Sequence, residues 1–281
     1  MTQILFYLPC NTCNTLFIRN TVLHLPSNYK YDFMKTICLL NHKGGVGKTT
    51  SVACIGAGLA LRGKRVLVID LDPQTNLTES MGVKDAPLSI YDAMSSGKPL
   101  PIIPVKENLS VVPSALNLAG LELEIAARMA RETILRRLIE PLKTKFDYVV
   151  IDCPPSLGLL TINGLVAADE VFIPLEAEFL AYRGIDTIVG IIETVRTHFN
   201  PNLFISGVFL TKYNRQRILT RSIRDEVSQY FGDVLFVNTV RVNVALAEAP
   251  ANGQDIFTYA PDSNGAEDYL AIVDELLKRH I

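Results

Sequence analysis

Short runs of apolar, β-branched residues alternate with longer helical stretches along most of the chain, beginning at Met34. Such alternation is typical of a single α/β domain whose mostly parallel, twisted sheet carries helices on both faces. The strands we expect are Thr36–Asn41, Arg65–Leu71, Leu109–Pro113, Tyr148–Asp152, Glu170–Leu175, Phe204–Thr211 and Val234–Val237. The helices we expect are Thr49–Arg62, Leu118–Glu140, Leu157–Ala168, Ala181–His198, Arg217–Phe231 and Ala266–Arg279.

The first 33 residues do not share this pattern. Their few charges are Arg19, Lys30 and Asp32, and Pro and Asn are scattered through them without a helical period. Met34 then opens the first expected strand, and we interpret it as a natural start. We therefore expect residues 1–33 to be a poorly ordered or mis-started extension and residues 34–281 to form one domain.

Composition limits the classes of function. The chain has 281 residues, 48% of them hydrophobic, which is enough for one large core. A net charge of −2 means that any affinity for nucleic acid must come from a local basic patch. No apolar stretch approaches the roughly 20 residues that cross a bilayer. Five cysteines, an odd number lying mostly in apolar runs, indicate a reducing compartment, so we expect a cytoplasmic protein.

A glycine-rich loop lies between the first expected strand and the first expected helix. It reads Lys43-Gly44-Gly45-Val46-Gly47-Lys48-Thr49-Thr50. Glycines let successive backbone N–H groups point inward, and the following helix begins with further free N–H groups. Together with the ammonium of Lys48 and the hydroxyl of Thr49, this arrangement predicts a polyphosphate site.

Aspartates stand at the ends of two expected strands. Asp70 and Asp72 follow one apolar run, and Asp152 ends another. The carboxyl ends of parallel strands form the ligand crevice of an open sheet, so we expect these acids near the glycine loop. Thr49 and Asp152 are the oxygen ligands we expect for Mg²⁺. Because alternation in a strand places Asp70 and Asp72 on one face, geometry alone does not separate their roles.

The sequence Lys-Gly-Gly-Val-Gly-Lys-Thr resembles the deviant Walker A box of the ParA/MinD family of P-loop ATPases, and the resemblance to ParA/Soj-type partition ATPases extends from Met34 to the end. It implies that Lys43 crosses a dimer interface to the partner's nucleotide; a solvated lysine is the alternative. It also implies that Asp72, in an Asp-Pro-Gln-x-Asn switch loop, orients the attacking water. Asp152 resembles the Walker B acid, and Asp70 either tunes the loop or caps the strand.

Two later segments bear on the choice of base. Thr211-Lys-Tyr-Asn214 is similar to the Thr-Lys-x-Asp element with which related GTPases read guanine. An asparagine there offers one acceptor and one donor, which suits adenine, so Asn214 favours ATP unless it only forms a turn. The segment Val242–Pro250 resembles one that lies near adenine in the family, and Asn243 is expected to contact the base. Ala245 replaces an arginine that many members use for DNA.

A basic stretch follows the late strand. Its members are Lys212, Arg215, Arg217, Arg221 and Arg224. Arg217, Arg221 and Arg224 share a helical face that could hold DNA phosphates without reading sequence. The alternative is a solvated face paired with Asp225 and Glu226.

These features together predict a Mg²⁺- and ATP-dependent dimerising ATPase for plasmid or chromosome partition. The resemblance implies a homodimer that sandwiches ATP, non-specific DNA binding on the nucleoid, and a ParB-like adaptor that accelerates slow hydrolysis. An acidic face on the last expected helix argues against a membrane role. Two alternatives remain at this point, namely a related ATPase that positions another cargo and a nucleotide-gated binding module with negligible turnover.

Overall fold

The computed structural model describes residues 15–18, 21–24, 34–178 and 184–280. The chain divides into two units, Met1–Phe33 and Met34–Ile281. In the first unit, strand β1 (Thr15–Ile18) pairs antiparallel with β2 (Thr21–His24), a hairpin that the sequence pattern does not predict. The assignment of residues 1–33 as an extension stays a prediction, and Cys10 and Cys13 lie outside the described residues.

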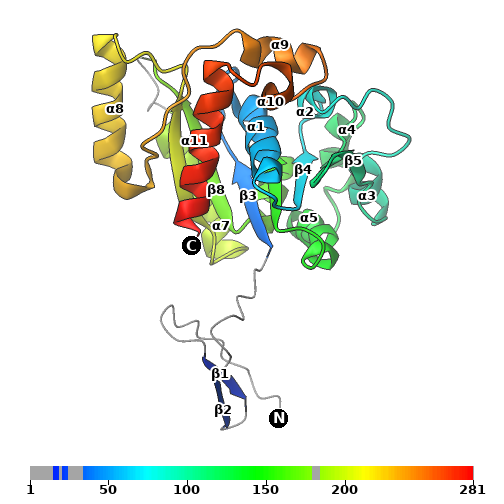
Figure 1. Ribbon diagram of the computed structural model, residues 1–281. Helices are drawn as coiled ribbons and strands as arrows, with labels where there is room; N and C mark the ends of the chain where they lie inside the picture. Colours follow the sequence, from blue (N-terminus) through cyan, green and yellow to red (C-terminus); the bar gives the residue numbers. More distant parts are fainter. Residues whose placement is uncertain (1–14, 19–20, 25–33, 179–183, 281) are drawn as a thin grey trace. The chain divides into compact units, whose positions relative to one another are not determined.

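The second unit is built on a seven-stranded sheet with the order β5-β6-β4-β7-β3-β8-β9 (Figure 1). All neighbouring pairs are parallel except β5 and β6. The strands are β3 (Lys35–Leu39), β4 (Val66–Asp70), β5 (Ile103–Lys106), β6 (Leu109–Val112), β7 (Tyr148–Asp152), β8 (Glu170–Glu176) and β9 (Phe204–Thr211). The predicted α/β fold with a mostly parallel sheet is confirmed.

Alternation along the central strands divides the apolar residues between two cores. In β3, Ile37 and Leu39 belong to one buried cluster, whereas Cys38 belongs to the other. The same alternation in β4 places Val68 in the first cluster and Ile69 in the second. Successive side chains of a strand point to opposite faces, so a strand buried on both sides must be apolar at every position.

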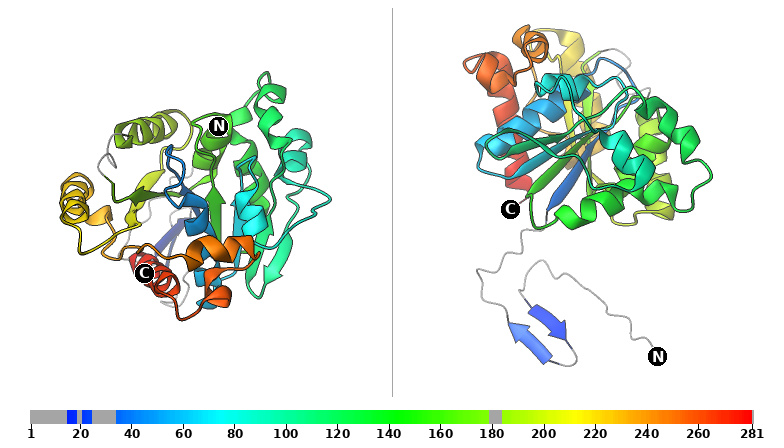
Figure 2. Two further views of the ribbon diagram at one scale, coloured as in Figure 1. Left: turned by 90° about the horizontal axis from the view of Figure 1, so that it is seen from above. Right: turned by 90° about the vertical axis from the view of Figure 1, so that its right-hand side faces the viewer.

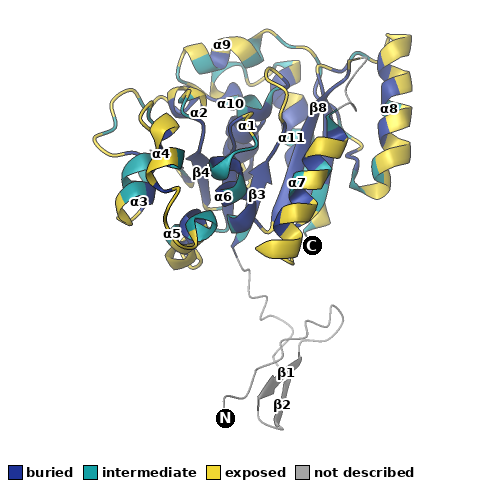
Figure 3. Cartoon of the chain, turned by 180° about the vertical axis from the view of Figure 1, so that it is seen from behind, coloured by how far each residue is buried: buried dark blue, intermediate teal, exposed yellow. Residues whose placement is uncertain are grey.

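Helices cover both faces of the sheet (Figures 1 and 2). On one face lie α1 (Lys48–Leu61), α10 (Ile256–Tyr259) and α11 (Asn264–Arg279), and their apolar side chains fill one cluster. On the other face lie α3 (Ile90–Ser96), α5 (Ile134–Ile139), α6 (Leu159–Ala167) and α7 (Ile185–His198), with exposed residues on their outer sides (Figure 3). Helix α8 (Ile218–Phe231) lies beyond β9 at the edge.

Small residues on α1 allow α11 to approach closely. A Cβ atom at Gly58 would lie 2.8 Å from the side chain of Val273 on α11. Tyr269, also on α11, is among the largest fully buried side chains of the described chain. The C-terminal helix therefore packs against α1 on the same face of the sheet. Within the described residues no helix is long and apolar enough to span a membrane.

Two strand predictions differ from the structure. The predicted strand Val234–Val237 is wrong, because only Leu235 forms an isolated parallel bridge to Val208 of β9. The N–H of Phe236 still donates to the carbonyl of Val208 at 2.7 Å, but those of Val237 and Asn238 donate to the side chain of Glu275 on α11 at 3.0 and 3.1 Å. Strand β5 escapes prediction because it is short, contains Pro104 and alternates between half-buried and exposed residues.

The predicted long helix Leu118–Glu140 is also wrong. It divides into α4 (Leu118–Glu124), a short 3₁₀ turn (Arg131–Thr133) and α5. Ala130 has a φ of 56°, a left-handed conformation that interrupts a helix. Asn163 of α6 then accepts the backbone N–H of Leu135 at 3.1 Å and donates to the carbonyl of Arg131, which fixes the new start.

The other predicted helices begin and end within a few residues of the observed ones, as far as they are described; residues 181–183 of one prediction lie outside the described part. Four further short helices have no counterpart in the prediction. They are α2 (Asn76–Ser80), α3, α9 (Ala245–Ala251) and α10. The last is a single turn, which periodicity does not reveal.

Candidate functional site

The glycine loop connects β3 to the first turn of α1, at the carboxyl edge of the sheet. Gly45 and Gly47 have φ angles of 76° and 84°, a conformation that side chains disfavour, which explains the glycines at these two positions. Asn41 fixes the start of the loop because its amide donates to the carbonyl of Pro174 on β8 at 2.7 Å. Its oxygen accepts the N–H of Lys43 at 2.9 Å.

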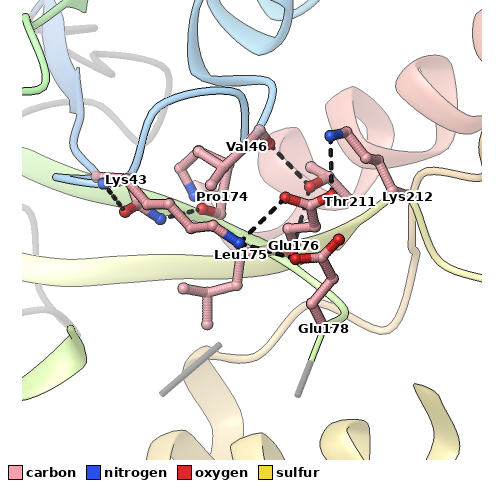
Figure 4. Close-up of polar contacts among 9 residues, drawn as sticks. Lys43, Val46, Pro174, Leu175, Glu176, Glu178, Thr211 and Lys212 are labelled. Atoms are coloured by element: carbon pink, nitrogen blue, oxygen red, sulfur yellow. Dashed lines mark hydrogen bonds and ion pairs between the residues drawn. The ribbon is translucent and has the colours of Figure 1, made fainter. Parts of the chain in front are cut away.

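Two more side chains hold the loop from other elements. The hydroxyl of Thr211, at the end of β9, donates to the carbonyl of Val46 at 2.8 Å (Figure 4). The hydroxyl of Ser51 donates to the carbonyl of Gly47 at 2.7 Å and lies 2.9 Å from the hydroxyl of Tyr269. The loop is therefore supported by β8, β9 and α11.

Lys48 and Asp152 form a buried ion pair behind the loop. Lys48 Nζ lies 3.1 Å from Asp152 Oδ1, with 8% and 0% of the two side chains exposed. Burial opposes the charge of Lys48, but neighbouring Asp152 outweighs it and raises the pKa of the lysine. Burial raises the pKa of Asp152, and Lys48 and the adjacent Thr49 act against this rise.

The second oxygen of Asp152 bears on a metal ion. Asp152 Oδ2 is buried and has no hydrogen-bond partner among the described residues. A buried carboxylate oxygen without a donor normally costs free energy, unless a cation or water satisfies it. With the hydroxyl of Thr49 nearby, the donor set is all oxygen and fits Mg²⁺, which binds through one or two protein ligands and several waters.

A cavity of 510 Å³ lies in front of the loop. Predicted site residues that line it are Lys43, Gly44, Gly45, Gly47, Lys48, Thr49, Thr50 and Asp72. Val46, Asp152, Asn214 and Asn243 do not line it. Pro155 contributes from the loop after β7, and Pro250 and Ala251 contribute from α9. The cavity therefore joins the glycine loop to the Asp-Pro-Gln-x-Asn segment, to the loop after β7 and to α9.

Asp70, the last residue of β4, and Asp72, two residues later, have different surroundings. Asp72 lines the cavity, whereas Asp70 is fully buried and does not. Burial and the charge of Asp152 raise the pKa of Asp70 to about 7. The structure thus separates two residues that the period of the strand placed on one face.

Lys43 contacts acidic residues of its own chain. Its Nζ lies 2.9 Å from Oε2 of Glu178, just after β8, and 3.5 Å from Oε2 of Glu176, the last residue of β8 (Figure 4). The other oxygen of Glu176 lies 2.8 Å from Nζ of Lys212. The hydrogen bond from Lys43 to Glu178 contributes most to the raised pKa of the lysine. Its predicted reach into a partner subunit remains a prediction.

The candidate base-reading residues differ in their hydrogen bonds. The side-chain oxygen of Asn214 accepts the N–H of Gln216 at 2.9 Å, which is the turn that the sequence left open as an alternative. Asn243 Oδ1 is buried and has no partner within the described residues. An unsatisfied amide of this kind is suited to a ligand.

Some side chains of the predicted basic stretch already have partners within the chain. Lys212 pairs with Glu176, and Arg224 donates to the carbonyl of Val237 at 3.0 Å. Arg215, Arg217 and Arg221 are exposed and form no salt bridge within the part of the chain that the structure describes, so the predicted pairing with nearby acids is not observed.

Sequence reasoning missed the supporting roles of Asn41, Thr211 and Ser51. The signal for Asn41 was its position as the one polar residue that ends an apolar strand run. Gln74 and Asn76 also line the cavity, and both belong to the Asp-Pro-Gln-x-Asn segment.

A glycine loop between a parallel strand and a helix, backed by a lysine and a strand-end aspartate, defines a P-loop nucleoside triphosphatase. Residues 34–205 match a family model described as an AAA domain. The chain is 42% identical to the sporulation initiation inhibitor protein Soj of Bacillus subtilis, over 86% of this chain and 98% of that protein. It belongs to the Soj/ParA family of partition ATPases.

Two further comparisons agree. The chromosome-partitioning ATPase Soj of Treponema pallidum is 39% identical, over 87% of this chain and 98% of that protein. The crystal structure of a cobyrinic acid a,c-diamide synthase from Mycobacterium smegmatis, with bound ADP and magnesium, is similar with a TM-score of 0.78. It is 33% identical and covers 88% of this chain and 95% of that one. Its ligands are of the classes that the glycine loop predicts.

Proposed function

We propose that this ATPase works as a dimer that sandwiches two ATP molecules, binds DNA without sequence preference in its ATP state, and releases DNA after hydrolysis. Partition of a plasmid or chromosome is the process that it serves, in the cytoplasm and on the nucleoid. A ParB-like adaptor is the expected partner that accelerates a slow reaction.

The observation that carries this proposal is the pair of lysines at the two ends of the glycine loop. Lys48 is buried and held by Asp152, which suits a charge that stays on the phosphates of its own subunit. Lys43 lines the same cavity, yet 46% of its side chain is exposed, so it can extend beyond the surface of the subunit. A second subunit placed over the cavity would bring a second ammonium to each triphosphate.

The remaining residues divide the chemistry among them. When bound, Mg²⁺ neutralises phosphate charge, and Thr49 and Asp152 are the side chains that would hold it. The N–H groups from Gly44 to Thr50 bind the phosphate oxygens, and Asp72 accepts a hydrogen bond from the attacking water and orients it. Asn243, whose oxygen is free, is the better candidate to contact the base, and Asn214 acts by shaping the turn after β9.

DNA binding is assigned to Arg215, Arg217 and Arg221, because their guanidinium groups are exposed and unpaired among the described residues. Lys212 and Arg224 contribute less, since each already has a partner. Phosphate contacts of this type give binding that is insensitive to sequence and sensitive to salt.

One set of measurements tests the proposal. Retention on a DNA column and molar mass by light scattering are recorded with ATP, ADP and no nucleotide, each with Mg²⁺. We expect a dimer that is retained only with ATP. A monomer with ATP would contradict the sandwich, and equal retention in all three conditions would contradict nucleotide control of DNA binding.

A further inference from the structure

The loop that carries Asp72 is tied to the sheet at both ends by a single carboxylate. Asp70 Oδ1 accepts the N–H of Asp72 at 3.0 Å, and Oδ2 accepts the N–H of Thr78 at 2.9 Å. Oδ2 also accepts the hydroxyl of Thr78 at 2.7 Å. Asp70 is the last residue of β4, so a fixed point of the sheet holds both ends of the connection to α2.

The hydroxyl of Thr78 extends this connection to a second strand. While it donates to Asp70, it accepts the backbone N–H of Ser114 at 2.9 Å. Ser114 comes shortly after β6, the neighbour of β4 in the sheet. Thr78 is 6% exposed and Asp70 0%, so water does not compete for these hydrogen bonds.

Inside this frame the loop adopts a tight turn. Asp72 Oδ1 accepts the N–H of Gln74 at 3.0 Å, and Thr75 has a φ of 59°. A residue other than glycine in this left-handed region is strained, and such strain persists only where the surroundings enforce it. Here Asp70 enforces the conformation, because it holds the loop on both sides of Thr75.

We propose that Asp70 and Thr78 are a positioning pair for ATP hydrolysis, which hold the Asp72 carboxylate where it orients the attacking water. This proposal rests on the role proposed above for Asp72. Neither residue of the pair lines the cavity, so both act through Asp72. A displacement of about 1 Å at a reacting group can lower a rate by roughly 100-fold, which is why such a frame matters.

Substitution of Thr78 separates positioning from general stability. In Thr78→Val the hydroxyl is lost, and we expect kcat for ATP to fall at least tenfold while KM changes less than twofold. Thr78→Ser keeps the hydroxyl and should restore most of kcat. Thr36→Val is the matched control, because Thr36 is also a buried threonine but lies at the start of β3, at the end away from the glycine loop. It should leave kcat unchanged.

A double-mutant cycle tests whether the pair acts through Asp72. In an Asp72→Asn background, Thr78→Val should cause no further fall in kcat. Wild-type turnover in Thr78→Val, an equal fall in Thr78→Ser, or additive losses in the cycle would each overturn the positioning role. Wild-type turnover in Asp72→Asn alone would instead contradict the water-orienting role of Asp72. If Thr78→Val does not fold, the same kinetic measurements are made on Asp70→Asn instead.

Discussion

Lys43 Nζ lies 2.9 Å from Glu178 Oε2, so the first lysine of the glycine loop forms an ion pair within its own subunit. The same ammonium reaches Glu176, and Glu176 in turn contacts Lys212 (Figure 4). A lysine that must cross to a partner has to leave these acids first. In the proposed dimer, the balance between these two positions of Lys43 would set how readily the subunits associate.

Replacement of Lys43 tests its role across the interface. Lys43→Gln removes the charge but keeps most of the side-chain length. We expect ATP-dependent dimerisation to weaken at least tenfold, measured by light scattering over a range of protein concentrations. Lys145→Gln, at another exposed lysine, is the control. Dimerisation equal to that of the wild type would show that Lys43 is only a solvated surface charge.

Replacement of Glu178 should have the opposite effect. Glu178→Gln weakens the acceptor that holds Lys43, and 61% of the Glu178 side chain is exposed. Exposed ion pairs are weak, so we expect the ATP-driven dimer to form at protein concentrations lower by at most about fivefold. Glu193→Gln breaks a comparable exposed pair with Arg196 and should have no effect. Weaker dimerisation in Glu178→Gln would contradict this account.

Thr211 provides a test of loop support. Thr211→Val removes the hydrogen bond to the carbonyl of Val46 while it keeps the shape of the side chain. The net value of such a bond is about 1 kcal/mol, so the Kd for ATP should rise roughly fivefold in a fluorescent-nucleotide titration. Thr194→Val, which removes an exposed hydroxyl on α7, should leave the Kd unchanged. An unchanged Kd in Thr211→Val would mean that the loop holds its shape without β9.

Charge reversal on α8 tests the DNA face. Arg217→Glu combined with Arg221→Glu should abolish retention of the ATP form on DNA. The DNA-binding constant K of the wild type should fall more steeply with salt than that of Arg217→Glu or Arg221→Glu alone. The slope of log K against log salt should be more negative by about two per dimer. The control is the pair Arg136→Glu and Arg137→Glu on α5, at the other end of the sheet (Figure 1). Retention by the α8 variant would remove this face from the proposal.

The contact between Glu170 and His280 predicts that the stability of the fold depends on pH in the acid range. Burial would raise the pKa of Glu170, but His280, at 2.9 Å, and Lys35 lower it to about 2. Because this pKa lies below that of a free carboxyl group, the stabilisation is present above about pH 4.5 and is lost as pH falls towards 2.

Urea unfolding at several pH values measures this contribution, which should amount to about 2–3 kcal/mol. In Glu170→Gln the fall in the free energy of unfolding between pH 4.5 and 2 should be smaller. Glu140→Gln, at an exposed carboxylate, should behave as the wild type does. An unchanged profile in Glu170→Gln would contradict the prediction.

The sequence was sufficient for the central sheet, because strands buried on both faces must be apolar throughout. It was insufficient where a side chain from a distant segment decided the local structure. Glu275 accepts the N–H of Val237, where the predicted strand Val234–Val237 should have continued, and Asn163 starts α5 in the middle of a predicted helix. Neither contact can be recognised from the pattern of apolar and polar residues near the segment that it affects.

The functional site was likewise predictable only in part. The glycine loop and its lysines could be located because the chemistry of phosphate binding requires those residue types in consecutive positions. The different surroundings of Asp70 and Asp72 could not be predicted, since they depend on Thr78 and on a backbone N–H after β6. Pairing of Lys43 with Glu178 was equally hidden, because 135 residues separate the two.

Tyr269 on α11 supports Ser51, which in turn holds the carbonyl of Gly47 in the glycine loop. The tyrosine lies 218 residues further along the chain than the serine that it contacts. The geometry of the nucleotide loop therefore depends on the packing of α11 against α1, so a substitution that loosens this helix should disturb the loop without touching it.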